Sequence, residues 1–266
     1  MYNFQYHKPD SVDAAVAAIG GAEDGKIVAG GMTLLPTMKQ RLAAPTDLVD
    51  LGAIDALKGI ALDGDTLVIG AMTTHAAVAQ SSVVAGHTPA LAALAEGIGD
   101  PQVRNRGTIG GSLANNDPTA DYPAAVLGLN ATVRTSKREV AADDFFDGMF
   151  TTVLDEDEII TAVAFPKPAK AAYKKFPNPA SRYAMVGVLV ALTDDHVRVA
   201  ITGAGQDGVF RASEMEAALS ADFHPEAIEE MALPAEGLNA DIHGSAEYRS
   251  HLVTVMAKRA VADAMG

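Results

Sequence analysis

Two short segments combine residue types that suit the binding of an anion. Residues 28–36 read VAGGMTLLP and residues 108–117 read TIGGSLANND, and in each a hydroxyl residue, Thr33 or Ser112, closely follows a Gly-Gly pair. Glycine has no Cβ, so the backbone N–H groups of such a loop can approach a phosphate without help from a lysine. One pair alone indicates a simple turn. Two pairs, each after a strand-like segment, predict loops that together clamp a diphosphate, as in a dinucleotide site.

A third glycine-rich segment matches a different dinucleotide pattern. Residues 203–208 read GAGQDG, which fits G-x-G-x-x-G and follows the apolar segment VRVAIT. Asp207, however, would place a carboxylate beside the incoming diphosphate, and no second strand with an acidic residue follows about twenty positions later. We therefore interpret this segment as a turn between a strand and a helix. An NAD(P)-dependent oxidoreductase that uses the segment Gly203–Gly208 is kept as an alternative function.

Acidic and basic residues lie on both sides of the second Gly-Gly pair. Asp121 could accept hydrogen bonds from a ribose or a ring N–H, or it could cap a helix, whereas Asp117 before Pro118 favours a turn or a cap. Arg104 and Arg106 are expected to be solvated, with contact to a phosphate or to a partner protein as alternatives. The segment DEDE, residues 155–158, is interpreted as a solvated turn.

Several classes of site are not supported by the residues. The 266-residue chain has no cysteine, which excludes disulfides, thiolate nucleophiles, and zinc or iron–sulfur ligation by its own thiolates. Its seven histidines show no metal-ligand spacing, and the serine-hydrolase and P-loop motifs are absent, so we predict neither a metal site nor a catalytic residue. A net charge of −14 argues against nucleic-acid binding.

The sequence also bears on location and on secondary structure. No apolar run approaches the roughly 20 residues that span a bilayer, and the N-terminus lacks a signal-peptide pattern, so we expect a cytoplasmic protein that is not integral to a membrane. Residues 1–53 alternate between strands and helices, with Ser11 as an N-cap, and the proline- and lysine-rich stretch 166–180 is interpreted as a linker or hairpin boundary. The predicted later elements are helices 89–96, 122–130 and 247–265, and strands 184–193 and 196–202, which pair through a turn at residues 194–195.

Longer stretches resemble a known family. AGGMTLLPTMKQR and RNRGTIGGSLANNDPTADYPAAVLGL resemble the FAD-binding medium subunit of molybdenum hydroxylases, the xanthine dehydrogenase and carbon monoxide dehydrogenase family. FFDGMFTTVLDEDEII, YKKFPNPASRYAMVGV and YRSHLVTVMAKRAV extend the resemblance over essentially the whole chain, and it is strongest to the carbon monoxide dehydrogenase medium subunit. The resemblance implies an α+β, PCMH-type (vanillyl-alcohol-oxidase-like) fold. FAD-binding subdomains at 1–53 and 54–170 would precede a C-terminal domain at 171–266 with a three-stranded antiparallel sheet and helices.

The resemblance also implies residues that contact FAD. Asp121 matches the family's flavin-binding aspartate, Leu154 its hydrophobic contact, and Lys175 its lysine near the flavin, although Lys174 offers a second register. Tyr183 matches an aromatic residue beside the ring, with a buried core tyrosine as the competing interpretation. The residues that would wrap the diphosphate and approach the isoalloxazine ring are Ala29, Gly30, Gly31, Met32, Thr33, Thr108, Ile109, Gly110, Gly111 and Ser112.

Two positions depart from the family pattern. Met32 stands where relatives often have histidine, and ANND follows the second pair where others have a histidine-containing stretch. A methionine side chain cannot donate a hydrogen bond, so a polar role of that side chain is lost while the backbone cradle is unaffected.

The implied function is that of one oxidoreductase subunit within a complex. [2Fe–2S] clusters on a small subunit and a molybdenum cofactor on a large subunit would supply electrons, in a dimer of heterotrimers, and this chain would pass them through FAD to an external acceptor such as a quinone. The substrate pocket would lie on the large subunit, which leaves carbon monoxide, a purine, an aldehyde and an N-heterocycle open. A scaffold subunit that has lost its cofactor is a further alternative.

Overall fold

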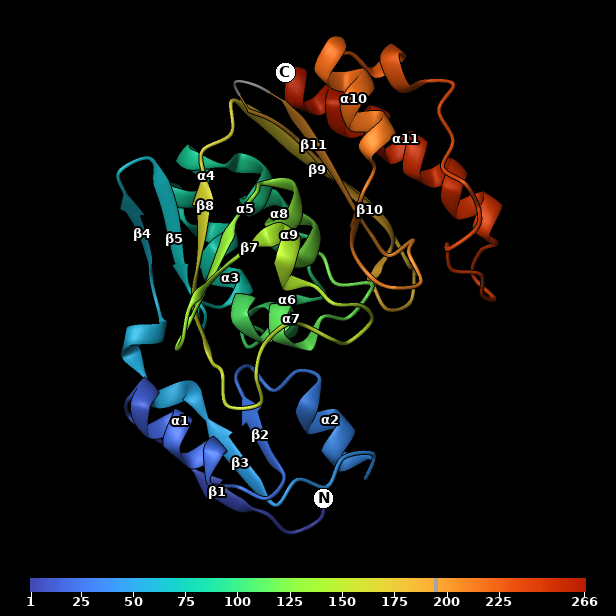
Figure 1. The fold of residues 1–266 in the computed structure, drawn as a ribbon. Helices are drawn as coiled ribbons and strands as arrows, with labels where there is room; N and C mark the ends of the chain where they lie inside the picture. Colours follow the sequence, from blue (N-terminus) through green and yellow to red (C-terminus); the bar gives the residue numbers. More distant parts are fainter. Residues whose placement is uncertain (194–195) are drawn as a thin grey trace.

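The computed structural model describes residues 1–193 and 196–266, and it confirms the predicted α+β class. Three sheets divide the molecule into an N-terminal part at the bottom of Figure 1, a central part, and a C-terminal part at the upper right. The predicted turn at residues 194–195 lies outside the described residues. In the part of the chain that is described, no helix is long and apolar enough to cross a membrane.

The N-terminal part is a parallel three-stranded sheet with the strand order β1-β3-β2. Its strands are β1 (Gln5–His7), β2 (Gly25–Val28) and β3 (Asp47–Asp50), and its helices are α1 (Val12–Gly20), α2 (Leu34–Lys39) and the 3₁₀ turns η1 (Leu51–Ala53) and η2 (Asp55–Leu57). Ser11 caps α1 as predicted, because its side chain accepts a hydrogen bond from the Ala14 N–H. The first Gly-Gly pair lies in the connection between β2 and α2.

The central part is built on an antiparallel sheet with the order β4-β5-β8-β6-β7. Its strands are β4 (Ile60–Asp63), β5 (Thr66–Gly70), β6 (Thr132–Thr135), β7 (Glu139–Ala141) and β8 (Ile160–Pro166). Its helices are α3 (His75–Gln80), α4 (Ser82–His87), α5 (Pro89–Glu96), α6 (Pro101–Arg104), α7 (Ile109–Asn115), α8 (Tyr122–Gly128) and α9 (Ala142–Phe145). The predicted helices at 89–96 and 122–130 correspond to α5 and α8.

The C-terminal part is an antiparallel sheet with the order β12-β11-β10-β9, followed by helices. Its elements are β9 (Lys170–Pro177), β10 (Ala184–Leu192), β11 (Val197–Thr202), β12 (Phe210–Arg211), α10 (Ser213–Ala221), η3 (Pro225–Ile228) and α11 (Ala246–Met265). The predicted antiparallel pair and the C-terminal helix are confirmed, and the two-residue β12 extends the three longer strands. Of the linker or hairpin boundary predicted at 166–180, the linker is wrong, because residues 170–177 form β9. The loop at 178–183 does connect β9 to the antiparallel β10, as a hairpin boundary would.

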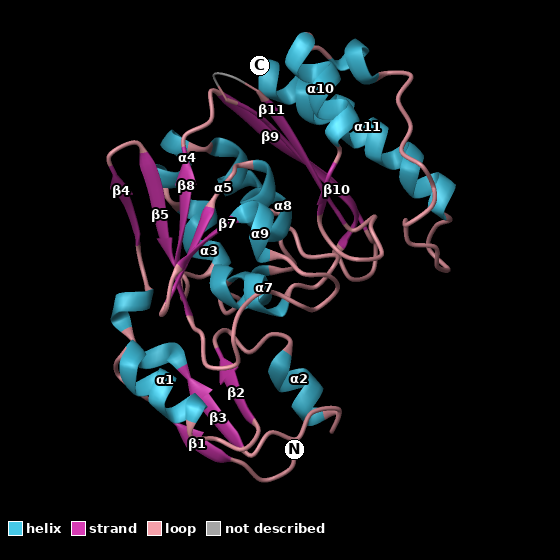
Figure 2. Ribbon diagram, viewed as in Figure 1, coloured by secondary structure: helices cyan, strands magenta, loops and turns pink. Residues whose placement is uncertain are grey.

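Both faces of the C-terminal sheet are covered. Along β10, Val186, Val188 and Val190 pack into the core beneath α10 and α11, whereas Leu189 and Ala191 join the core of the central part. Figure 2 shows α11 lying along one face of this sheet. A strand that is buried on both sides needs apolar residues at every position, which accounts for the continuous apolar run of β10. This packing fixes β9 and the loop after it against the central part.

Candidate functional site

A cavity of about 420 Å³ lies where the three parts meet. The connection after β2, the start of α7, the segment before β8 and the loop between β9 and β10 all contribute to its wall. All predicted site residues except Ile109 and Lys175 line this cavity. Residues that are far apart in the sequence are thus brought to one place, as the diphosphate-clamp interpretation required of the two Gly-Gly segments.

The first Gly-Gly segment is an open loop between β2 and α2. Gly31 has a φ of +73°, a left-handed conformation that glycine adopts without strain. A Cβ on Gly30 would lie 2.1 Å from the Arg106 carbonyl oxygen, so a glycine here lets the loop touch the chain just before α7. In the part of the chain that the structure describes, the N–H groups of Gly30, Gly31, Met32 and Thr33 donate no hydrogen bond within the protein. The loop therefore offers a run of unused donors to an anion.

The second Gly-Gly pair is not a loop after a strand, and in this respect the prediction is wrong. It follows α6 and forms the first turn of α7, with Thr108 as N-cap: the Thr108 hydroxyl accepts a hydrogen bond from the Gly111 N–H at 3.1 Å. The Gly110 N–H donates to the Ala71 carbonyl at 2.9 Å, and the Ser112 N–H to the Thr108 carbonyl at 3.0 Å. These amides already have acceptors inside the protein.

The second pair instead permits close packing. A Cβ on Gly110 would lie 2.6 Å from the Ala71 Cβ, and a Cβ on Gly111 would lie 3.4 Å from the Ala29 Cβ. At Gly110 only glycine lets α7 lie this close to the central sheet, whereas the 3.4 Å at Gly111 is an ordinary van der Waals contact with the first segment. Ile109 is fully buried, so it supports the wall from behind and does not face the cavity.

Asp121 is buried at the start of α8 and is held by two residues of β9. Its carboxylate lies 2.9 Å from the Lys175 Nζ and 2.5 Å from the Tyr173 hydroxyl. Burial raises the pKa of Asp121 above its usual value, even though Lys175 and Tyr173 act in the opposite direction. Lys174 points to the other side of β9 and pairs with Asp263 on α11 at 2.9 Å. The side chain that reaches Asp121 is thus that of Lys175.

Tyr173 was missed in the sequence, although a signal for it exists. Residues two apart on a strand share a face, so Tyr173 and Lys175 must point the same way from β9. Burial, together with the neighbouring Asp121, raises the pKa of Tyr173 well above its usual value, which keeps the hydroxyl protonated as a donor to Asp121.

Tyr183 and Met32 are accessible parts of the wall. The Tyr183 side chain is 46% exposed, so the alternative of a buried core tyrosine is wrong. It follows Arg182, whose φ of +63° turns the chain at the end of the loop after β9. Met32 is 39% exposed. Both are large side chains in the cavity wall, and a flat ring bound in the cavity could pack against them.

His75, at the start of α3, is a second residue that the sequence did not single out. It is 5% exposed and lies in the cavity wall, with its ring centroid 5.3 Å from that of Tyr122. The backbone N–H of His75 donates to the Gly107 carbonyl, and a Cβ on Gly107 would lie 2.4 Å from the ring Nε2. Burial, aided by the charge of Arg104, lowers the pKa of His75 to about 4, so the ring is neutral. A single histidine with no second metal-ligating or catalytic residue at a characteristic spacing cannot be identified as a site residue from the sequence.

Charged residues near the cavity differ in part from expectation. Arg104 is not simply solvated, because its guanidinium donates to the carbonyls of Ile98 and Gly99; Arg106 is exposed as predicted. Asp117 forms the predicted turn by accepting a hydrogen bond from the Thr119 N–H at 2.9 Å.

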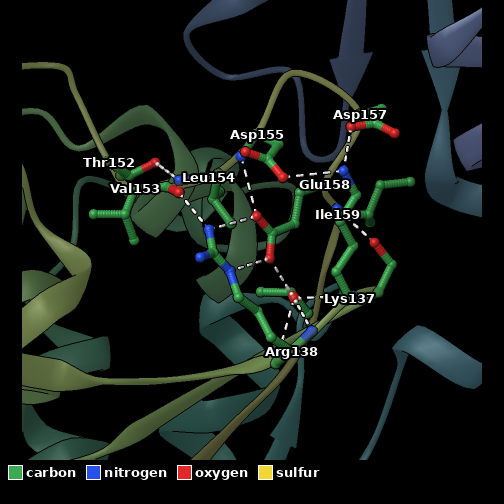
Figure 3. A network of polar contacts seen from close by, with 11 residues as sticks. Lys137, Arg138, Thr152, Val153, Leu154, Asp155, Asp157, Glu158 and Ile159 are labelled. Atoms are coloured by element: carbon green, nitrogen blue, oxygen red, sulfur yellow. Dashed lines mark hydrogen bonds and ion pairs between the residues drawn. The ribbon is translucent and has the colours of Figure 1, made fainter.

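The segment DEDE is not a solvated turn throughout. Glu158 is only 3% exposed and is bonded to Arg138 in a polar network (Figure 3), whereas Asp155 is exposed. The spacing of the acids could not reveal this difference, since the partner of Glu158 lies on another strand connection.

The alternative dinucleotide motif at residues 203–208 does not form a Rossmann turn. It joins β11 to β12, which run antiparallel, so it is neither part of a βαβ unit nor the strand-to-helix turn that we predicted. A Cβ on Gly203 would lie 2.4 Å from the Ala184 carbonyl oxygen, which gives this glycine a packing role. Among the described residues, no group of three or more potential metal ligands is present.

Family models match the chain in two consecutive blocks. Residues 2–168 match the FAD binding domain in molybdopterin dehydrogenase, and residues 171–264 match the CO dehydrogenase flavoprotein C-terminal domain. Together these matches cover all three sheets and the loops that line the cavity.

Individual relatives and solved structures agree with these matches. The chain is 38% identical to the nicotine 6-hydroxylase medium subunit of Paenarthrobacter nicotinovorans, over 98% of this chain and 96% of that protein. It is 37% identical to the carbon monoxide dehydrogenase medium chain of Hydrogenophaga pseudoflava, over 97% and 96%. The structure of the carbon monoxide dehydrogenase from Hydrogenophaga pseudoflava that lacks the Mo-pyranopterin moiety superposes with a TM-score of 0.88 at 36% identity, over 99% of this chain and 97% of that one. The chain therefore belongs to the FAD-binding medium subunits of the molybdenum hydroxylases, the xanthine dehydrogenase and carbon monoxide dehydrogenase family of oxidoreductases.

Proposed function

We propose that this chain carries FAD in the cavity at the meeting point of its three parts, as the medium subunit of a carbon monoxide dehydrogenase-type hydroxylase. The observation that carries the proposal is the run of unused N–H donors from Gly30 to Thr33, which opens onto that cavity. Such a cradle fits a diphosphate, and the rest of the cavity wall, mostly apolar with the buried Asp121 and the accessible Tyr183, fits a flavin.

Each part of the site would have its own task. The first segment, Ala29 to Thr33, would bind the diphosphate through backbone N–H groups, while Gly110 and Gly111 let α7 close the other side. Asp121, held by Lys175 and Tyr173, would orient the flavin or its ribityl chain by hydrogen bonds. Leu154 and Tyr183 would shield the ring from water. None of these residues needs to act as an acid or a base.

When bound, FAD supplies the capacity to receive electrons from iron–sulfur clusters and to pass them to an external acceptor such as a quinone. Since this chain has no cysteine, the clusters must be held by another subunit. We propose a small iron–sulfur subunit and a large molybdenum subunit as partners, arranged as a dimer of heterotrimers in the cytoplasm. The division of this chain at residues 53 and 170 belongs to the same proposal.

The substrate of the complex would be chosen by the large subunit. Two relatives with nearly equal identity to this chain are named nicotine 6-hydroxylase and carbon monoxide dehydrogenase. The degree of similarity between medium chains therefore does not indicate which substrate the complex oxidises. We propose a carbon monoxide dehydrogenase-type complex on the overall likeness. The active-site loop of the large subunit would distinguish a gas from a purine, an aldehyde or an N-heterocycle.

The proposal is tested by titrating the purified chain with FAD and, separately, with FMN. FMN has the same ring but a single phosphate and no adenosine, so it cannot use a diphosphate cradle. We expect one FAD per chain, with visible flavin absorbance, and binding of FMN that is weaker by at least roughly a hundredfold, the factor that corresponds to two or more lost hydrogen bonds. Equal binding of the two flavins would contradict the cradle, and binding of neither would favour a scaffold subunit.

A further inference from the structure

The segment from Thr152 to Ile159, which carries Leu154 into the cavity wall, has little regular structure of its own. It is held instead by the turn between β6 and β7, residues 136–138, and by Thr135 at the end of β6 (Figure 3). The Ser136 N–H donates to the Ile159 carbonyl at 2.8 Å, and the Ile159 N–H donates to the Ser136 hydroxyl at 3.1 Å. The position of this wall thus depends on a turn that does not itself line the cavity.

Glu158 is the centre of that attachment. One carboxylate oxygen accepts from the Thr135 hydroxyl at 2.6 Å and from the Arg138 Nε at 3.0 Å. The other accepts from the Arg138 Nη2 and from the Asp155 N–H, both at 3.0 Å. An ionised carboxylate has about four acceptor positions, and here all of them are used. A glutamine would replace acceptors with an N–H₂ group that faces a donor.

Arg138 connects both ends of the segment. Its Nη2 donates to the Val153 carbonyl at 2.7 Å as well as to Glu158. Leu154 lies directly after Val153, and Glu158 closes the loop four residues later. The guanidinium therefore holds the chain on both sides of Leu154. Because the guanidinium is planar and its N–H groups point in fixed directions, these contacts leave the segment little freedom to move.

A second ion pair on the same segment provides a contrast. Lys137 lies 2.5 Å from Asp157 and 3.1 Å from Asp155, but these carboxylates are 40% and 60% exposed, whereas the Glu158 side chain is fully buried. Exposed pairs contribute little, because water and salt screen them. Burial by itself raises the pKa of Glu158, but the hydrogen bonds from Arg138 and Thr135 outweigh it and bring the pKa to about 2.

We propose that Glu158, clamped by Arg138, is a positioning residue for FAD: it fixes the segment 153–158 so that Leu154 is presented to the flavin. This inference rests on the proposed function, since it concerns the same cavity. It assigns a role at the cofactor site to the last acid of the DEDE motif and to an arginine outside the cavity.

The test compares Glu158→Gln with Asp157→Asn, two neutralised acids on one segment. We expect Glu158→Gln to raise the dissociation constant for FAD roughly tenfold and to change the visible circular dichroism of the bound flavin, because the wall beside the ring shifts. Asp157→Asn removes only one of the two exposed ion pairs of Lys137 and should leave both readouts within about twofold of the wild type. Unchanged affinity and an unchanged spectrum in Glu158→Gln would overturn the proposal.

A double-mutant cycle separates positioning from general destabilisation. If Glu158 acts through Leu154, the loss of FAD affinity in Leu154→Ala should be smaller in the Glu158→Gln background than in the wild type, and simple additivity would overturn the proposal. Should Glu158→Gln not fold, Arg138→Lys replaces it, because lysine keeps the charge but not the fork that also reaches Val153. A wild-type chain that binds no FAD would refute the proposed function; normal wild-type binding with unaffected variants would refute only this inference.

Discussion

The two Gly-Gly segments look alike in sequence but do different work in the structure. In the first, the N–H groups from Gly30 to Thr33 have no acceptor within the described protein and open onto the cavity. In the second, Gly110, Gly111 and Ser112 donate to the Ala71 carbonyl and to Thr108. The first segment therefore has donors free for the anion that we propose, whereas the second lets a helix pack closely against it. Their difference separates ligand binding from folding, and the two can be tested apart.

The largest effect is expected for Gly110→Val. A Cβ here would lie 2.6 Å from the Ala71 Cβ and 2.8 Å from the Ala71 carbonyl oxygen, so the backbone of α7 must move. Overpacking of this kind destabilises by about 3 kcal/mol. We expect urea denaturation to show this loss in the absence of any flavin. An unchanged unfolding midpoint would mean that the second segment is not a packing element.

His75 makes the region of the second segment sensitive to pH. Its pKa in the folded chain is about 4, below the unperturbed value of 6.5, so below pH 6.5 the unfolded chain takes up a proton that the folded chain excludes. The stability present above pH 6.5 should fall by about 3 kcal/mol as the pH drops to 4. The variant His75→Gln, which cannot titrate, should show a flatter profile, measured by denaturation at several pH values. If stability depended on pH equally in the wild type and in His75→Gln, the titration of His75 would be excluded as the cause of the pH dependence.

Gly31→Ala should act mainly on the ligand. A φ of +73° is unfavourable for alanine by about 1 kcal/mol, and relaxing it would reorient the unused donors. Gly64, in the β4–β5 turn, has a similar φ of +59° but open space around its Cβ, whereas a Cβ on Gly31 would lie 2.8 Å from the Leu35 Cδ1, so Gly64→Ala controls for the backbone conformation alone. We expect a small loss of stability in Gly64→Ala and a larger one in Gly31→Ala, where the Leu35 side chain must also shift, with FAD affinity reduced roughly tenfold only in Gly31→Ala. Equal affinities would remove the first segment from the diphosphate site.

The smallest effect distinguishes the two threonines. The Thr108 side chain caps α7, whereas the Thr33 side chain makes no cap hydrogen bond with α2. Thr108→Ala should therefore lower stability by about 1 kcal/mol, while Thr33→Ala should leave it nearly unchanged, as measured by thermal unfolding. The reverse order would contradict the assignment of the second segment to folding.

The sequence predicted much of the architecture, for identifiable reasons. The apolar runs of β10 and β11 indicate buried strands, the C-terminal helix has apolar residues at helical spacing, and the structure confirms both. The strand β9 was interpreted as a linker or hairpin boundary, because lysines and flanking prolines obscure a strand whose residues alternate between an ion pair with α11 and a contact with Asp121. The secondary structure of such a segment depends on the residues that it contacts in the fold, and its local composition does not show which residues these are.

Only part of the candidate site could be predicted from the sequence. The glycines and hydroxyls marked the two segments, and a family resemblance marked Asp121 and Tyr183, which the structure places at one cavity. The sequence does not show which backbone N–H groups already donate a hydrogen bond within the protein. The Gly110 N–H, for example, donates to the Ala71 carbonyl, which lies 39 positions earlier in the chain. Glu158 was misassigned for the same reason, since Arg138 comes from another connection.

The central claim, that the chain carries FAD, is tested most directly by denaturing the purified complex and identifying the flavin it releases. We expect FAD in equal amount to this chain. Release of FMN, or of no flavin at all, would contradict it.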